Sequence, residues 1–263
     1  MNTILMKLRF LAFFVLLLST GVTRAQDTDK YAVWGPTDTE RQAGFMVRLG
    51  YVIGGTTPVP LPAEIRSINA FHPFGGISLG ADAYWMLSRR WGVQVGWHFF
   101  YEGFHTSANV KNYFMGITKD GNYLEGYFTG VDETDTKMFG ATVPLTATFR
   151  LSPRWNVSAG PFVSMLYTKR FEGEVYDGYL REGNPTGQKI EMTKDSPATY
   201  DFQDDMLNCY WGVELMFDWK AMRHMNVFGG LDWSCSSIFP SSFKTVHFKM
   251  FPLYAKLGIA YRY

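Results

Sequence analysis

The chain has 263 residues, enough for one all-β domain or at most two small domains. Its formal net charge of +1 gives no reason to expect a nucleic acid or an anionic surface as partner. The mean hydropathy of −0.11 lacks the bulk hydrophobicity of a helical membrane protein, yet 17% of the residues are aromatic, as expected where rings gather at membrane interfaces.

The N-terminus has the features of a secretory signal peptide. Lys7 and Arg9 precede an apolar run over residues 10–18, and small residues occupy the two cleavage positions of Thr23-Arg24-Ala25. The run is shorter than the roughly 18 residues that a spanning helix requires. We therefore expect cleavage of residues 1–25, export of the protein, and a polar periplasmic tail over residues 26–42.

In the rest of the chain, apolar and polar side chains alternate with a period of two, the pattern of a β-strand with one apolar face. Eight such segments occur, at residues 45–53, 77–87, 91–102, 139–151, 155–170, 209–220, 225–235 and 253–263. The last segment ends the given sequence on an aromatic residue. Its upper half, from Val246 to Met250, is out of phase, so we expect a bulge near Phe251 and Pro252.

The connections between these segments are short and long in strict alternation. Short turns lie at residues 88–90, 152–154 and 221–224, and longer loops at 54–73, 103–137, 171–202 and around Pro240. This alternation is typical of an antiparallel up-and-down barrel whose turns face one compartment and whose loops face the other. We therefore expect one barrel domain over residues 43–263.

The side chains opposite the apolar set decide between a soluble lipocalin-like barrel and a transmembrane one. They include ten ionisable groups: Arg48, Asp82, His98, Glu102, Arg150, Glu214, Asp218, Asp232, Lys256 and Arg262. An eight-stranded barrel is just wide enough for side chains to fill, so small residues and paired charges fit inside and rows of Trp and Phe do not. The sequence therefore predicts an all-β fold, an eight-stranded transmembrane β-barrel with a charged lumen.

Aromatic residues also gather beside the short turns and the C-terminus. Amphipathic rings prefer the headgroup level of a membrane. We expect one interface girdle to consist of Trp85, Trp91, Trp155, Trp219, Tyr261 and Tyr263.

Several phrases of the sequence resemble a known family. These are the turns Leu-Ser-Arg-Arg-Trp (87–91) and Leu-Ser-Pro-Arg-Trp (151–155), the loop phrase at 173–187, and the terminal Tyr-Arg-Tyr. With the signal peptide and the eight alternating strands, they resemble the PorT-like outer-membrane β-barrel proteins of the Bacteroidetes over nearly all of residues 43–263. The resemblance implies location in the outer membrane and insertion by the barrel-assembly machinery, but little about activity.

The lumen charges allow a catalytic hypothesis. The 88–90 turn sets Asp82 opposite Gly96 and diagonal to His98, so Ser78, Asp82 and His98 could form the rudiment of a hydrolase site. Ser78 lies too far along its strand, and ion pairs that fill the lumen explain the same residues. No metal-ligand spacing or phosphate loop occurs, so we predict no catalytic, cofactor or metal site.

The two cysteines leave two alternatives open. If Trp219 pairs with Met225, Cys209 and Cys235 lie directly opposite on the lipid side, and export to an oxidising compartment permits a disulfide. A change of one register step would leave two free thiols.

These features predict an outer-membrane protein, surrounded by lipid, with a structural, binding or accessory role in the envelope rather than an enzyme. A protein partner could bind loops 103–137 and 171–202. The alternatives are a small-solute channel and, less well supported, a lipid-modifying enzyme.

Overall fold

The structure, a computed structural model, describes residues 43–58, 62–240, 242–243 and 249–263. The expected signal peptide and polar tail lie outside these residues. The strands are β1 (Ala43–Pro58), β2 (Ile65–Met86), β3 (Trp91–Lys119), β4 (Asn122–Arg150), β5 (Trp155–Glu182), β6 (Lys189–Met192), β7 (Ala198–Asp201), β8 (Cys209–Lys220), β9 (Met225–Ser234) and β10 (Met250–Arg262). No helix that is long and apolar enough to cross a membrane occurs in this part of the chain.

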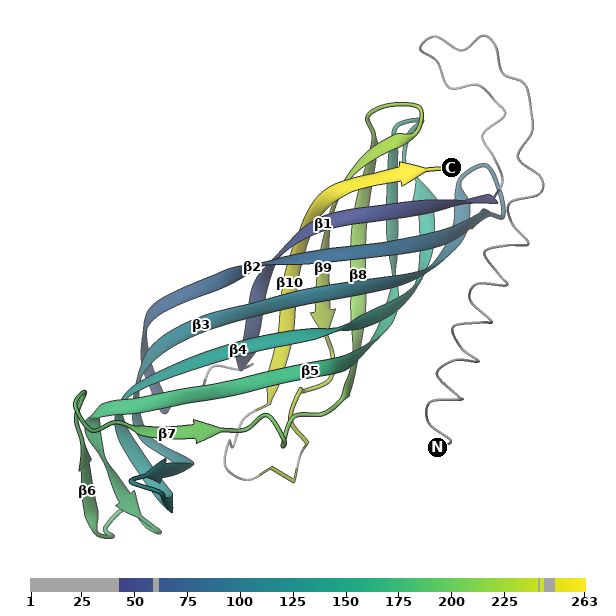
Figure 1. Ribbon diagram of the computed structural model, residues 1–263. Coiled ribbons are helices and arrows are strands. Elements are labelled where there is room, and N and C mark those ends of the chain that lie inside the picture. Colours follow the sequence, from purple (N-terminus) through teal and green to yellow (C-terminus); the bar gives the residue numbers. More distant parts are fainter. Residues whose placement is uncertain (1–42, 59–61, 241, 244–248) are drawn as a thin grey trace, which may run out of the picture.

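Eight of these strands form a closed antiparallel barrel (Figure 1). Each long strand pairs with the next along the chain, β5 pairs with β8, and β10 returns to pair with β1 from Met46↔Arg262 to Pro58↔Met250. The predicted eight-stranded up-and-down barrel is confirmed.

The two faces of the barrel wall are the reverse of those in a soluble protein. Along β8, Trp211 and Val213 point outward and are 54% and 46% exposed, whereas Glu214 and Asp218 point inward and are 1% and 3% exposed. The lipocalin-like alternative is therefore wrong. An apolar exterior around a polar interior is the arrangement that lipid requires.

The short turns share one backbone design. The amides of Leu87 and Ser88 both donate to the carbonyl of Trp91, and the Trp91 amide lies 3.0 Å from Ser88 Oγ. The same contacts recur in the turn at residues 151–155. The repeated phrase Leu-Ser-x-Arg-Trp is thus a turn unit that closes a hairpin and begins the next strand with an exposed Trp.

The strands extend far beyond the barrel on the side opposite the turns. A spanning strand needs about 9–11 residues, whereas β3 and β4 have 29 residues each and β5 has 28. The prediction of loops over residues 103–137 and 171–202 is wrong for most of their length, because these residues form strands. The period-two pattern is absent there since no lipid imposes it: residues 131–135 are all partly exposed.

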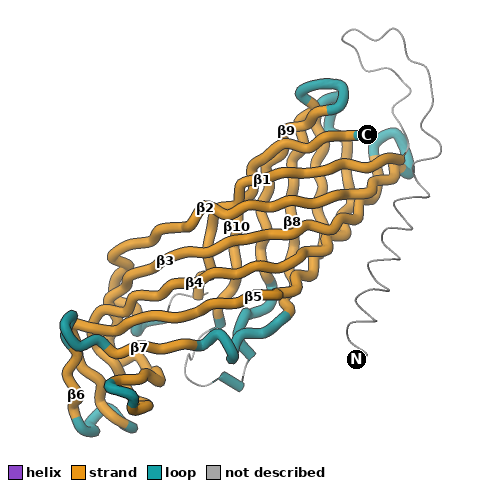
Figure 2. The backbone as a smooth tube through the Cα atoms, viewed as in Figure 1, coloured by secondary structure: helices purple, strands orange, loops and turns teal. Residues whose placement is uncertain are grey.

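This extension comprises residues 104–136, 171–182, β6 and β7. Its β3–β4 hairpin has a register shift between Val110 and Tyr113, next to Asn112, whose φ is +56°. The hairpin tip then pairs with β7 through Thr118↔Thr199, and β7 also pairs with β5. Figures 1 and 2 show this folded end at the lower left, opposite the C-terminus.

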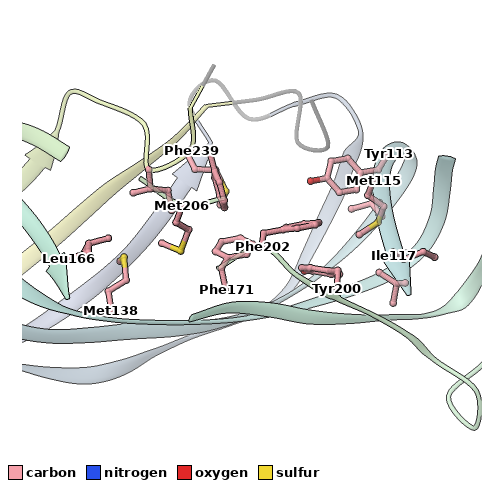
Figure 3. Packing of buried hydrophobic residues seen from close by; sticks show 14 of the residues in the cluster. Tyr113, Met115, Ile117, Met138, Leu166, Phe171, Tyr200, Phe202, Met206 and Phe239 are labelled. Carbon is pink, nitrogen blue, oxygen red and sulfur yellow. The ribbon is translucent and has the colours of Figure 1, made fainter. Parts of the chain in front are cut away.

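Apolar side chains fill the extension and the adjoining part of the barrel. Figure 3 shows them as one continuous row, from Met138 and Leu166 at the barrel end to Tyr113 and Ile117 at the far end. The extension therefore has a hydrophobic core that continues into the adjoining part of the barrel.

The bulge expected near Phe251 and Pro252 is absent, because β1 and β10 pair without a register shift. Met250 points inward with Pro252 and Tyr254, and all three are buried. An apolar residue fits the inward phase there because the interior is apolar at that height. Val246 and Phe248 lie outside the described residues.

Candidate functional site

The first group in the lumen is organised by Arg48 of β1. Its Nε donates to Asp82 Oδ2 at 2.5 Å, and its Nη1 and Nη2 donate to the two carboxylate oxygens of Asp218 at 2.8 and 3.1 Å. His98 Nε2 lies 2.8 Å from the other oxygen of Asp82. These side chains come from β1, β2, β3 and β8, so one guanidinium joins strands on opposite sides of the barrel. The planar, two-pronged geometry is the one in which Arg binds carboxylates most strongly.

The second group is organised by Lys256 of β10. Its Nζ pairs with Asp232 Oδ2 of β9 and lies 3.4 Å from Glu214 Oε2 of β8. Lys256 is 8% exposed and Glu214 is 1% exposed. A buried charge without a partner is very costly, so each cation stabilises the carboxylates beside it.

Two glycines leave room for these groups, and hydroxyl side chains line the lumen beside them. Gly80 pairs with His98 and Gly96 with Asp82, and a Cβ at either glycine would overlap the side chain opposite. On the neighbouring strands, hydroxyl pairs complete the polar lining. They are Thr142–Ser164 at 2.7 Å and Thr148–Ser158 at 2.9 Å.

Phe100, Met138 and Phe162 form an apolar layer across the lumen, on the side of the charged groups that faces the extension. Between the two layers lies a cavity of about 10 Å³, lined by Glu102, Tyr210, Asp232, Tyr254 and Lys256 among others. This volume holds one water molecule at most. The charged groups are therefore enclosed between the turn end and the apolar core, with little free space.

The structure brings together most of the predicted lumen residues. Arg48, Asp82, His98 and Asp218 form the first group, and Glu214, Asp232 and Lys256 the second. Glu102 lines the small cavity with Asp232 and Lys256, and Tyr210 Oη lies 3.5 Å from its Oε1.

The two remaining predicted residues lie at the turn end. Arg150, at the end of β4, lies opposite Asn156 of β5 in the strand register. Arg262 Nε donates to Tyr84 Oη at 2.6 Å. Tyr210 was not among the predicted lumen residues, although its place in the polar phase was the available signal.

The catalytic hypothesis has no support in this geometry. Asp82 lies opposite Gly96, as predicted from the turn, but its carboxylate is shared between Arg48 and His98. Ser78 lines the small cavity with His98 but makes no hydrogen bond to it in the described part of the chain. Nor do three or more His, Cys, Asp or Glu side chains gather to hold a metal ion there.

Both cysteines are free and exposed, so the disulfide alternative is wrong. Trp219 pairs with Val227 rather than Met225, because the turn closes at Lys220↔Asn226. This register step sets the Cys235 amide against the Trp211 carbonyl, so Cys235 no longer faces Cys209.

The six residues of the expected girdle are all exposed at the turn end of the barrel, between 39% and 60%. Neighbouring rings contact one another: the Trp155 and Trp219 centroids are 6.4 Å apart, and those of Tyr261 and Tyr263 are 4.9 Å apart. This belt has the position that interfacial rings take in a membrane.

A polar cluster in the extension was not predicted. Tyr200 Oη of β7 donates to Asp132 Oδ1 at 2.8 Å and lies 2.6 Å from Thr134 Oγ1. Burial raises the pKa of Asp132 to about 6, even though the Tyr200 hydrogen bond favours the carboxylate. Nearby, Tyr176 Oη donates to Glu133, and this hydrogen bond together with burial raises the pKa of Tyr176 to about 12.

Comparison with known protein families identifies the same type of protein, an outer-membrane β-barrel. The model of a family described as "outer membrane protein beta-barrel domain" matches residues 25–240. No curated protein matches the chain at a significant level.

Three solved structures are similar. Ail of Yersinia pestis is 10% identical (84% of this chain, 99% of that one, TM-score 0.36). Neisserial surface protein A is 11% identical (84% and 99%, TM-score 0.37). OprG of Pseudomonas aeruginosa is 15% identical (84% and 97%, TM-score 0.33).

Proposed function

Since this chain belongs to the outer membrane protein β-barrel domain family, we propose that it is a closed barrel with a structural or binding role in the cell envelope. Under this proposal the barrel anchors the protein in the outer membrane, and the extension presents a folded surface to the outside. It is neither a porin nor an enzyme.

The observation that carries the proposal is the filled interior. The Arg48 and Lys256 groups occupy the lumen, and the apolar layer above them includes Phe100, Met138 and Phe162, none more than 4% exposed. A porin keeps a water-filled channel, which this arrangement does not provide.

The finer assignments are part of the same proposal. Residues 1–25 are removed on export, residues 26–42 remain in the periplasm, and the terminal aromatic residue is read by the barrel-assembly machinery. The protein is PorT-like and from a Bacteroidetes envelope, as the turn and loop phrases imply. An envelope protein binds at residues 103–137 and 171–202, where the extension lies.

Conductance in planar lipid bilayers tests the closed barrel. The purified full-length protein should insert without stable conductance steps. A variant with Met138→Ala and Phe162→Ala should show increased conductance, because it removes part of the apolar layer. Stable steps in the unmodified protein would contradict the proposal and support a small-solute channel.

A further inference from the structure

A cavity of about 140 Å³ lies where β3, β4 and β7 of the extension meet the ends of β1 and β2. Buried aromatic side chains contribute to its wall, among them Phe104, Tyr113 and Phe202, which are 2%, 8% and 7% exposed. Phe71 lines it too and is 48% exposed, so the cavity reaches the surface. Its volume is close to the roughly 150 Å³ of an apolar protein cavity that binds benzene.

One side of the cavity is acidic. Asp132 lines it beside Tyr200 and Thr134, and among the described residues no Lys, Arg or His pairs with the Asp132 carboxylate. The charge that acts on it is that of Glu133, which is also negative. The raised pKa of Asp132 reflects this uncompensated, half-buried charge.

We propose that this cavity binds a small organic amine whose apolar body is about the size of a single ring. The ammonium group would lie against the Asp132 carboxylate and the faces of the surrounding rings, and the apolar body would fill the cavity. Carboxylates bind ammonium groups by charge-assisted hydrogen bonds, and aromatic faces attract cations. A neutral ligand would leave the charge of the carboxylate without a cation, and an anion would be repelled by Asp132 and Glu133.

This inference rests on the proposed binding role of the extension. It does not depend on the charged lumen, so closure of the barrel can hold even if the cavity binds nothing.

Ligand-observed ¹⁹F NMR tests the proposal on the full-length protein in detergent micelles near pH 7.5. The probes are 4-fluorobenzylamine, its neutral isostere 4-fluorobenzyl alcohol, and 4-fluorobenzoate. The amine should bind at least tenfold more tightly than the alcohol, and the benzoate should not bind. Asp132→Asn should reduce amine affinity to that of the alcohol, and Ala108→Phe, which fills the cavity, should abolish binding of both.

Asp135→Asn is the matched control. Asp135 lies three residues further along β4, has a side chain that is 43% exposed, and pairs with His105 rather than lining the cavity. This variant should keep the affinity and the selectivity of the unmodified protein, and heat-modifiable migration should show that all variants are folded. Equal binding of amine and alcohol, amine binding that survives Asp132→Asn, or signals that report only partition into micelles would overturn the proposal.

Discussion

Arg48 holds Asp82 and Asp218 from opposite sides of the lumen, and all three side chains are at least 96% buried. The guanidinium charge compensates the charges of the two buried carboxylates. Two carboxylates enclosed in a barrel wall have no water to replace the guanidinium, so each ion depends on the others. The guanidinium carbon also lies over the ring of Phe228, 4.9 Å from its centroid, in a cation–π contact.

Replacing Arg48 with Leu should therefore destabilise the barrel by about 3–5 kcal/mol, the usual cost of breaking a buried ion pair. Urea unfolding in lipid vesicles, followed by heat-modifiable migration, measures the change. The triple variant Arg48→Leu, Asp82→Asn, Asp218→Asn should regain much of the loss, because no unpaired charge remains. Arg89→Leu, in an exposed turn, is the control. A triple variant as unstable as Arg48→Leu would show that packing, not charge, dominates.

Position 96 has no room for a side chain larger than that of glycine, since a Cβ there would overlap Asp82 Oδ1. Gly96→Ala should cost about 1–3 kcal/mol in the same unfolding assay, because Asp82 or His98 must move. Gly229→Ala is the matched control, as its Cβ would have no neighbour closer than 3.9 Å. Equal stability of the two variants would argue against a tightly filled lumen.

Residues of the lumen were largely predictable, because the strand period assigns each side chain to a face. Tyr210 was missed because an aromatic ring does not resemble a lumen residue when it is judged by polarity rather than by phase. Cysteine pairing was not predictable in the same way. It depends on the number of residues in one turn, and a shift of two residues separates Trp219↔Val227 from Trp219↔Met225, the pairing that would bring Cys209 and Cys235 together.

At the scale of elements, lipid explains where the sequence pattern is strong. Inside the membrane each strand must alternate, and the eight segments were found. In the extension both faces of the hairpins meet water or a local core, so β3 and β4 continue through residues 104–136 without that pattern. The register shift within the β3–β4 hairpin lies at Asn112, whose positive φ a residue pattern does not show.

The extension should also respond to pH through Asp132. Its pKa in the fold, about 6, lies above the ordinary 3.8, so folding favours the protonated form. The stabilising contribution is therefore complete below about pH 4 and is lost as the pH rises through about 6. Hydrogen exchange of the β4 and β5 amides in the extension, corrected for intrinsic rates, should show easier opening at pH 7 than at pH 4.5. In Asp132→Asn this difference should shrink, and an unchanged difference would assign the effect to another group.

The whole molecule has two parts that distribute polar and apolar side chains in opposite ways. In the barrel, polar groups are enclosed and apolar groups face outward, whereas the extension buries an apolar core as a soluble domain does. Membership of the outer-membrane β-barrel family agrees with the first part. The second part is where this chain differs from a bare eight-stranded barrel, and it carries the proposed binding site.

The orientation of the barrel side chains is the central claim, and oxygen accessibility of single spin labels in lipid vesicles tests it most directly. Labels would replace Val213, Leu215 and Phe217 of β8, and Ser158 and Ser164 of β5, in a protein without Cys209 and Cys235. We expect high accessibility to oxygen dissolved in the acyl chains at the three β8 positions and low accessibility at the two β5 positions, whose side chains point into the lumen. The reverse order, or no difference between the two sets, would contradict the account.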